Sequence, residues 1–396
     1  MMTFEQFQQQ LFEQTRYIFV EKPMSEATGQ AYWTTPRHLF VKRYRLWGSE
    51  VWQEVIEQNL AEHLARLYDD KPLILFGDDD DHILSTISQP SLVLSMLDML
   101  QLEPGQQVLE LGAGSGWNAA LMGQLVGATG RVYSLEIIPE MAQTAAVTVE
   151  ALGLNNVSII EADGGAGYAP GAPYDRAVFT AGTYDLPHHF YAQIKEGGLL
   201  LIVIKNEGGR DNLFLLQKMG DHFESLDSQP CGFVQMTGKY QLEALEPQTL
   251  ETLPGWMHLE TQELSRMPFW WGGKGGHGLR WRTAGVRSFL GIIEPHFRVF
   301  KAEKGEGQVH DEYFFGLWDE PNQSLVIARD DQLMAYGSLA ARERLQANLH
   351  HWVDLGMPAA ASFDLHIYPA HVPLTPGRNQ WLVKRAESQF LWCLEK

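Results

Sequence analysis

The sequence predicts an α/β protein with a doubly wound parallel sheet, a helical N-terminal segment and a C-terminal α+β domain. Two observations carry this prediction. Between residues 84 and 240, segments typical of strands alternate with segments typical of helices, the pattern of a parallel sheet covered on both faces. One strand turns into a helix through Gly112, Gly114 and Gly116, as in folds that bind a nucleoside beside a strand end.

The N-terminal residues 1–83 are predicted to be helical and to pack on the central domain. Thr3–Phe19 has apolar residues at helical spacing, and we expect more helix over Arg37–Tyr44 and Glu50–Leu67. Gly77–Asp81 is an acidic loop. We interpret it as a solvated surface run, and weak cation binding by Asp78–Asp81 stays open.

Residues 84–241 form the predicted central domain. Its strands are Val108–Leu111, Arg131–Leu135, Val157–Glu161, Tyr174–Thr180 and Leu199–Ile204, with Leu213–Lys218 and Gly232–Met236 as a closing antiparallel pair. Its helices are Ser91–Leu102, Trp117–Val126, Pro139–Gly153 and Pro187–Ile194. Pro90 suits a helix start, where its missing N–H costs nothing, and Gly153 suits a helix end.

Residues 242–396 form the predicted C-terminal domain, with Pro247 in a polar boundary. We expect strands at Phe297–Phe300, Glu312–Leu317, Ser324–Ala328 and Ser362–Tyr368, and a helix at Leu339–Leu355. Phe269–Gly278 (FWWGGKGGHG) lacks the Walker A spacing and is interpreted as a loop. The nearby Trp270, Trp271 and Trp281 are either core residues or peptide contacts.

Composition limits the function. The 396 residues include 45% hydrophobic and 20% charged residues, as in ordinary globular proteins. A net charge of −19 argues against nucleic-acid binding, because attraction to phosphate underlies that affinity. Cys231 and Cys393 lack metal spacing, which suggests a reducing compartment. We therefore expect a cytoplasmic protein with no metal, membrane or nucleic-acid partner, and the polar N-terminus shows no signal sequence.

Glu136 ends the strand after the glycine turn and lies twenty residues beyond Gly116, where a carboxylate can hold a ribose diol. The spacing Glu-x-Gly-x-Gly-x-Gly, which starts at Glu110, differs from the dinucleotide pattern. It resembles motif I of S-adenosylmethionine-dependent methyltransferases. In such enzymes, groups at the position of Asp163-Gly164 surround the adenine.

A more specific resemblance covers Tyr68–Tyr240. These residues resemble protein-L-isoaspartate O-methyltransferases, a family with a Rossmann-like methyltransferase sheet. The matching pieces are Thr86–Pro90 (TISQP), Val108–Gly116, Tyr133–Glu140, Asp163-Gly164, Ala172–Asp175, Gly197-Gly198 and Phe233–Thr237. The resemblance implies S-adenosylmethionine as methyl donor and the α-carboxylate of an isoaspartyl residue in a protein or peptide as acceptor.

The resemblance also implies roles for single residues. Ser88 would hydrogen-bond and orient the acceptor carboxylate, although a helix-capping serine is the alternative. The donor would contact Thr86, Glu110, Gly112, Gly114, Gly116, Glu136, Ile137, Asp163 and Gly164. The acceptor side would include Thr180, Ala181 and Thr237. A carboxylate acceptor with a pKa of about 4 is already ionised, so no general base is required.

Two departures from the family pattern affect the acceptor side. Before the TISQP signature, this chain has His82–Ser85 where the family has a segment that contains Gly and Gln. After the fourth strand, it has Thr180–Asp185 where the family has an alanine-rich stretch. Two alternatives therefore stay open. The chain could be a pathway-specific aspartate methyltransferase for a ribosomally made peptide, as in family members with an appended domain. It could also be an inactive donor-binding adaptor. A base-flipping methyltransferase is disfavoured, since no Asn/Asp-Pro-Pro-Tyr/Phe motif follows the fourth strand.

Overall fold

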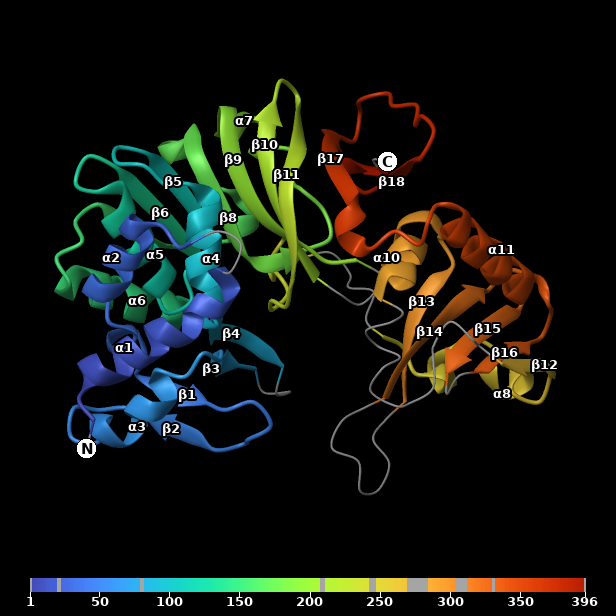
Figure 1. Ribbon diagram of the computed structural model, residues 1–396, viewed down its shortest axis with the longest axis horizontal. Helices are drawn as coiled ribbons and strands as arrows, with labels where there is room; N and C mark the ends of the chain where they lie inside the picture. The colour runs from blue at the N-terminus through green and yellow to red at the C-terminus, as the bar shows by residue number, and fades with distance from the viewer. Residues whose placement is uncertain are drawn as a thin grey trace. The chain divides into compact units, whose positions relative to one another are not determined.

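The computed structural model describes residues 2–19, 23–78, 82–206, 211–241, 247–268, 284–302, 312–329 and 332–394 (Figure 1). The chain divides into two units. Unit 1 comprises Met1–Val203, Leu213–Ser228 and Gly232–Gln241, and unit 2 comprises Ile204–Asn212, Gln229–Cys231 and Leu242–Lys396. The predicted boundaries at residues 84 and 242 stay predictions. Asp79–Asp81, the segment 269–278 and Trp281 lie outside the described residues.

The parallel part of unit 1 has the strand order β8-β5-β6-β7, with β9, β10 and β11 following beyond β8. Its strands are β5 (Gln107–Leu111), β6 (Arg131–Glu136), β7 (Val157–Glu161), β8 (Tyr174–Thr183), β9 (Ile194–Ile204), β10 (Asp211–Met219) and β11 (His222–Cys231). β5 pairs in parallel with both β6 and β8. The chain therefore leaves β5 toward one side and returns on the other, which opens a crevice at the carboxyl ends of these strands.

Helices cover this sheet much as predicted. They are α4 (Pro90–Leu100), α5 (Trp117–Val126), α6 (Pro139–Ala151), the short α7 (Phe190–Gln193), and the 3-10 turns η3 (Gly164–Ala166) and η4 (Ala169–Gly171). α5 packs against β5 and β6, and α6 packs against β6 and β7. Pro90 and Pro139 lie at the first helical position, and Gly153 has a φ of +69°, so the start and stop signals in the sequence are confirmed.

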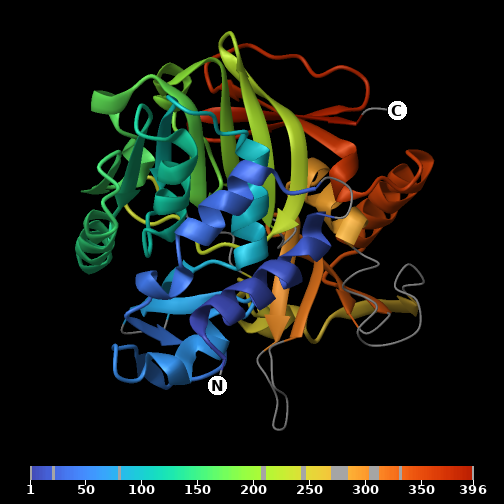
Figure 2. The ribbon, with the colours of Figure 1, turned by 60° about the vertical axis from the view of Figure 1, so that its left-hand side comes forward.

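The N-terminal part of unit 1 is only partly helical. Its elements are α1 (Phe4–Thr15), η1 (Arg16–Phe19), α2 (Glu26–Thr34), η2 (Arg37–Phe40), β1 (Arg43–Arg45), β2 (Trp52–Glu54), α3 (Leu60–Leu67), β3 (Leu73–Gly77) and β4 (Ile83–Ile87). The four strands form a separate sheet in the order β2-β1-β3-β4. Figures 1 and 2 show α2 beside α4 and α5, which it contacts.

The helix predictions over Arg37–Tyr44 and Glu50–Leu67 hold only for η2 and α3 and were wrong between residues 41 and 59, which include the stretch from 43 to 54. An antiparallel hairpin occupies this stretch, with Arg45 paired with Trp52. Gly48, at a φ of +75°, lies in its turn, a conformation that favours glycine and interrupts a helix. The capping box of α1, in which Thr3 and Gln6 exchange hydrogen bonds, confirms the first helix.

The predicted pairing of Gly232–Met236 with β10 was also wrong. The neighbour of β10 is β11, and Gly220, with a φ of +61°, lies between these two strands. β11 is mostly exposed or half-buried, so its sequence lacks the apolar alternation of a recognisable strand. Gln235 instead forms a parallel bridge with Gly182 at the end of β8. This places residues 233–237 at the carboxyl ends of the parallel strands.

Unit 2 is an α+β structure. It contains η5 (Leu250–Thr252), α8 (Trp256–Leu259), β12 (Glu263–Pro268), α10 (Ala284–Ile293), β13 (Phe297–Ala302), β14 (Glu312–Asp319), β15 (Ser324–Arg329), β16 (Gln332–Tyr336), α11 (Ala340–Asp354), η8 (Ala360–Ser362), β17 (Phe363–Pro369), β18 (Gln380–Lys384) and β19 (Ser388–Leu394). Five strands form a sheet in the order β12-β16-β15-β14-β13, and β17, β19 and β18 pair consecutively. The predicted strands and helix are confirmed, but β12, α10, β16, β18 and β19 were missed.

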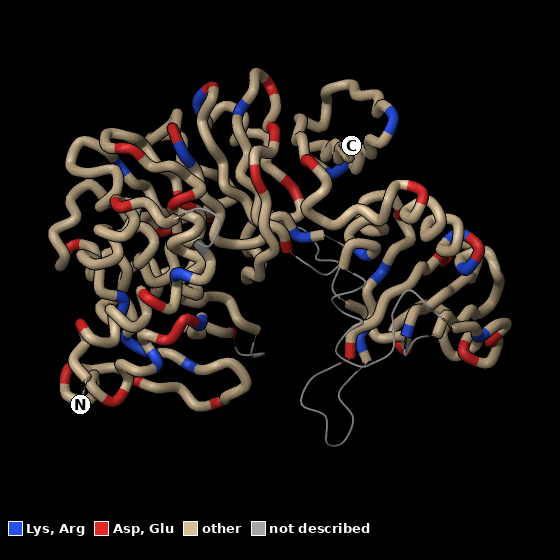
Figure 3. Tube along the Cα trace, viewed as in Figure 1, with Lys and Arg blue, Asp and Glu red and all other residues tan. Residues whose placement is uncertain are grey.

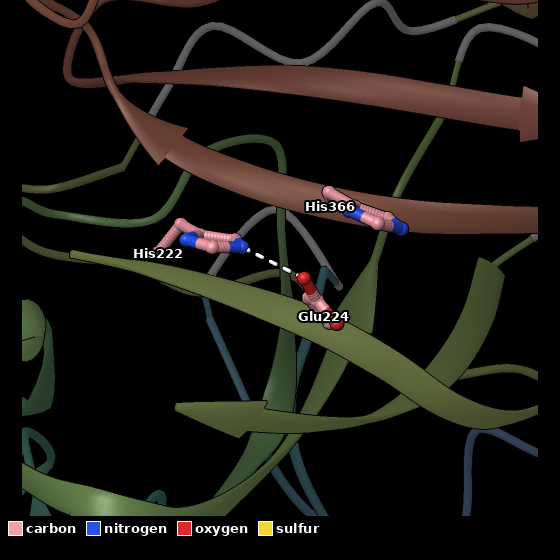
Figure 4. A group of neighbouring side chains, drawn as sticks. All are labelled: His222, Glu224 and His366. Atoms are coloured by element: carbon pink, nitrogen blue, oxygen red, sulfur yellow. Dashed lines mark hydrogen bonds and ion pairs between the residues drawn. The ribbon is translucent and has the colours of Figure 1, made fainter. Parts of the chain in front are cut away.

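Charged residues are spread over both units, and Asp and Glu outnumber Lys and Arg by 49 to 30 (Figure 3). No helix in the described part of the chain is both long enough and apolar enough to cross a lipid bilayer. On β11, the imidazole of His222 lies 2.9 Å from the carboxylate of Glu224 (Figure 4). These two side chains lie outside the pocket described next.

Candidate active site

A pocket in unit 1 lies at the carboxyl ends of β5, β6 and β8. It is lined by residues 84–88 on β4 and the loop after it, by 110–115 of the glycine turn, by 135–138 after β6, and by 233–237 beside β8. The crossover from β5 to neighbours on both sides positions this opening, where open α/β sheets bind their ligands. The pocket therefore contains most of the residues that the sequence singled out.

The glycine turn brings bare backbone to the pocket. Gly112, Gly114 and Gly116 have φ values of +92°, +52° and +83°, which side chains rarely adopt. A Cβ on Gly112 would lie 2.6 Å from the Thr180 hydroxyl oxygen. The Thr180 hydroxyl oxygen lies 2.8 Å from the carbonyl oxygen of Leu111 and 2.6 Å from that of Gly112. The hydroxyl can therefore donate its hydrogen bond to either carbonyl. Thr180, predicted on the acceptor side, thus also holds the turn against β8.

The Glu136 carboxylate links β6 to this turn. One oxygen accepts a hydrogen bond from the Gly114 amide at 2.7 Å, and the other accepts one from the Ile138 amide at 3.0 Å. Burial raises the pKa of Glu136, and these backbone donors oppose that rise. Each carboxylate oxygen has a second lone pair, so the group can also accept hydrogen bonds from a ribose diol.

Glu110 lines the pocket and is fully buried. Its carboxylate accepts hydrogen bonds from Asn118 at 2.7 Å and from the Ser134 hydroxyl at 2.5 Å. Burial raises the pKa of Glu110 to about 7, and the neighbouring Glu136 adds to this rise. Asn118 and Ser134 were missed by the sequence reasoning. A polar residue between Val132 and Leu135, both buried and apolar, was the available signal for Ser134.

Ser88 lines the pocket, and its hydroxyl has no hydrogen-bond partner among the described residues. It does not cap α4, whose N-cap residue is Gln89. Asp70 caps the helix instead, since its carboxylate accepts from the Ser91 amide at 2.8 Å and from the Gln89 side chain at 3.1 Å. The capping alternative for Ser88 therefore finds no support in the structure. Thr86 lies beside Ser88 in the lining.

Asp163 lies at the edge of the site rather than in the pocket lining. Its two oxygens accept from the amides of Gly165 at 2.9 Å and Lys239 at 2.7 Å. It thus ties the segment after residue 237 to the loop that follows β7. The adenine contact predicted for Asp163 stays a prediction. Gly164, Ala181 and Thr237 do line the pocket.

The lining fits S-adenosylmethionine in its chemistry. Glu136 offers a carboxylate for a diol, and the glycine turn leaves backbone open to a zwitterionic tail. Ile137 is 37% exposed although it lines the pocket, which leaves an apolar side chain for a purine to cover. Gly164 leaves room next to Leu111, because a Cβ there would lie 2.5 Å from the Leu111 Cγ.

Comparisons with known proteins agree with this geometry. The family model for protein-L-isoaspartate(D-aspartate) O-methyltransferase matches residues 49–241. The protein-L-isoaspartate O-methyltransferase of Ignicoccus hospitalis is 36% identical over 184 residues, which cover 46% of this chain and 83% of the relative. Protein-L-isoaspartate O-methyltransferase 1 of Archaeoglobus fulgidus is 36% identical over 243 residues, which cover 59% of this chain and 99% of that relative.

A solved structure of a protein-L-isoaspartate O-methyltransferase has the same fold, with a TM-score of 0.54 and 23% identity, over 92% of this chain and 96% of that one. The fold and the pocket define a class I methyltransferase, an enzyme whose cofactor is S-adenosylmethionine. Within that class, the chain belongs to the protein-L-isoaspartate O-methyltransferase family. The family predicted from the TISQP signature and the glycine turn is confirmed.

Proposed function

We propose that this enzyme methylates the α-carboxylate of L-isoaspartyl residues in proteins or peptides, a reaction of protein repair in the cytoplasm. The observation that carries the proposal is Ser88, a lining residue whose hydroxyl has no hydrogen-bond partner in the described part of the chain. A buried hydroxyl normally has a hydrogen-bond partner, which is either the protein or an ordered water. Ser88 is therefore available to donate to an acceptor carboxylate.

The titratable side chains of the pocket support a carboxylate acceptor. Among the described lining residues these are Glu110 and Glu136 only, and both already accept hydrogen bonds from the protein. An amine or hydroxyl acceptor would need a base to take its proton, whereas a carboxylate is ionised at neutral pH. When bound, S-adenosylmethionine supplies an activated methyl group that a carboxylate oxygen can take without any proton transfer.

The chain then has to position its acceptor and exclude water. Ser88 orients the carboxylate, and no Lys or Arg is among the described residues that line the pocket. A neutral donor leaves the carboxylate more nucleophilic than an ion pair would. Positioning of this kind supplies much of the rate when no proton is moved. Thr180, Ala181 and Thr237 line the same pocket and are assigned to the acceptor side.

On the donor side, we assign Glu136 to the ribose, Ile137 and Gly164 to the adenine, and the turn Gly112–Gly116 with Thr86 to the amino-acid part. Glu110 accepts a hydrogen bond from Asn118 on α5 and so ties β5 to the helix that follows the turn. Asp163 keeps its predicted place near the adenine amino group. The relatives reported above give no support to a pathway-specific peptide enzyme or to an inactive adaptor.

The test is methyl transfer from labelled S-adenosylmethionine to two peptides that differ only in Asp or isoAsp at one position. We expect transfer to the isoAsp peptide alone, with the label released by mild base as expected for an ester. Transfer to the Asp peptide would contradict the assigned acceptor. Transfer to neither peptide, with donor binding intact, would also contradict it and would direct the search to a dedicated peptide partner.

A further inference from the structure

Arg37 is a buried arginine that holds the backbone around Ser88. The residue is 1% exposed. One terminal nitrogen, Nη2, donates to the carbonyl oxygen of Ser88 at 3.1 Å, lies 3.4 Å from that of Ile87, and is 3.1 Å from that of Lys71. The other, Nη1, donates to Leu67 at 2.7 Å and lies 3.4 Å from the Asp69 oxygen. One guanidinium thus joins the end of α3 to the loop after β4.

The positive charge of the Arg37 guanidinium has no ion-pair partner among the described residues. No carboxylate lies within salt-bridge distance of Arg37 in the described part of the chain, and Asp69 contributes its backbone oxygen rather than its carboxylate. Burying a cation is costly unless several acceptors surround it. Capping a short helix such as α3 would need only the carbonyls at its own end. Helix capping therefore does not explain why Arg37 also contacts the carbonyl oxygens of Ile87 and Ser88.

The same part of the chain reaches the glycine turn. The guanidinium of Arg37 lies 5.6 Å from the ring centre of Trp117, the first residue of α5. The Trp117 indole donates to the Thr35 carbonyl at 3.0 Å. Residues 35–37 therefore contact the loop that carries Ser88 and also Trp117, which directly follows the glycine turn.

We propose that Arg37 is a positioning residue: it fixes the backbone at Ile87 and Ser88 and so aims the Ser88 hydroxyl at the acceptor. This inference rests on the proposed function, in which Ser88 binds the acceptor carboxylate. The planar guanidinium reaches carbonyls on two segments at once, which the single ammonium of a lysine cannot reproduce. The effect of Arg37 on the reaction therefore passes through Ser88.

The test is a double-mutant cycle with Arg37→Lys, Ser88→Ala and the double variant. Arg37→Lys should lower kcat on the isoAsp peptide about 10- to 100-fold, as expected for a misplaced binding group. Donor affinity should stay within about twofold, because Arg37 hydrogen-bonds none of the residues assigned to the donor. The double variant should match Ser88→Ala within about threefold. Independent multiplication of the two losses, or an unchanged kcat for Arg37→Lys, would overturn the proposal.

The matched control is Arg176→Lys. Arg176 donates from Nε to the Leu100 carbonyl at 2.7 Å and from Nη2 to Gln101 at 3.3 Å, at the far end of α4. Its chemistry resembles that of Arg37, but Leu100 and Gln101 do not line the pocket as Ile87 and Ser88 do, so kcat should be retained. Should Arg37→Lys not fold, Arg37→Gln removes the buried charge and enters the same cycle with the same expected result.

Hydrogen–deuterium exchange separates this inference from the proposed function. Arg37→Lys should speed amide exchange at residues 85–91 and leave exchange at residues 131–151 unchanged. If wild-type enzyme transfers no methyl group to isoAsp peptides, the proposed function fails. Faster exchange at residues 85–91 would then still support the loop-holding role of Arg37. Unchanged exchange at residues 85–91 would overturn that role whether or not the enzyme is active.

Discussion

The carboxylate of Glu136 lies 2.7 Å from the amide nitrogen of Gly114, and this hydrogen bond joins the end of β6 to the glycine turn of β5. Both elements line the pocket. A ligand that occupies the pocket therefore meets a carboxylate already oriented by the backbone. Such an orientation lowers the entropy that a binding group loses when it engages a ribose.

Glu136→Ala should weaken binding of S-adenosylhomocysteine by about 1–3 kcal/mol, because the ribose loses a charged acceptor. Titration calorimetry would measure this loss. Glu161→Ala is the matched control, since Glu161 is the register partner of Glu136 on β7 and is exposed. The control should bind donor as the wild type does.

Loss of the Gly114 contact could lower affinity without any ribose contact, so the ligand has to be changed as well. A 2′-deoxy analogue should bind the wild type more weakly than the parent ligand. The Glu136→Ala variant should discriminate less between the two ligands. Equal discrimination by both proteins would remove Glu136 from the ribose site.

Gly112→Ala should destabilise unit 1 more than Gly105→Ala does. The two glycines have nearly the same φ, +92° and +89°, so an alanine would be under similar backbone strain at either position. A Cβ on Gly105 would have 3.6 Å of room to the nearest atom, whereas on Gly112 it would lie 2.6 Å from the Thr180 oxygen. Overpacking of this kind costs about 1–3 kcal/mol, measurable by urea unfolding.

Thr180→Ala supplies the internal check for the glycine prediction. It removes the oxygen that the new Cβ would strike, and the next nearest atoms lie 3.9 Å away. Adding it to Gly112→Ala should recover part of the lost stability. If the double variant is as unstable as the sum of the two single variants, the clash is not the cause.

Ser88→Ala should lower kcat about 10- to 100-fold, because a hydrogen bond to a charged group is worth about 1.5–3 kcal/mol. Donor affinity and thermal stability should be retained, since the hydroxyl has no partner in the described structure and Asp70 caps α4. The control is Ser158→Ala on the exposed side of β7. A loss of stability with full activity would instead indicate a capping serine.

The glycine turn and its flanking elements could be predicted because the signals are local. Val108 and Leu109 are buried apolar strand residues, and the turn glycines have the positive φ values that their spacing suggests. Helix α5 has the predicted bounds, Trp117–Val126. The N-terminal hairpin could not be predicted in the same way, because strands of three residues carry too short a pattern.

The supporting contacts of the site were beyond sequence reasoning for a different reason. Arg37 donates a hydrogen bond to Ser88, which is 51 residues away in the sequence. Asp70 accepts one from the Ser91 amide, 21 residues away. Neither pair has a periodic spacing, so only the folded chain brings them together. The same holds for Ser134 and Glu110, which lie on adjacent parallel strands in direct register.

Glu110 should make the stability of unit 1 depend on pH near neutrality. Burial raises its pKa to about 7 from an ordinary value of 4.5. Between these values the unfolded chain releases the proton while the folded chain keeps it. Stability is therefore fully present below about pH 4.5 and is lost as the pH rises toward and through 7. Each unit of pKa shift corresponds to about 1.4 kcal/mol.

Glu110→Gln removes this ionisation and can still accept a hydrogen bond from Asn118 at the amide oxygen. Urea unfolding of unit 1 at pH 5, 6, 7 and 8 should show the wild type losing stability relative to the variant by about 1–3 kcal/mol as the pH rises. Carboxylates common to both proteins cancel in the difference. A difference that stays constant from pH 5 to pH 8 would mean that Glu110 titrates near its ordinary pKa in the folded protein.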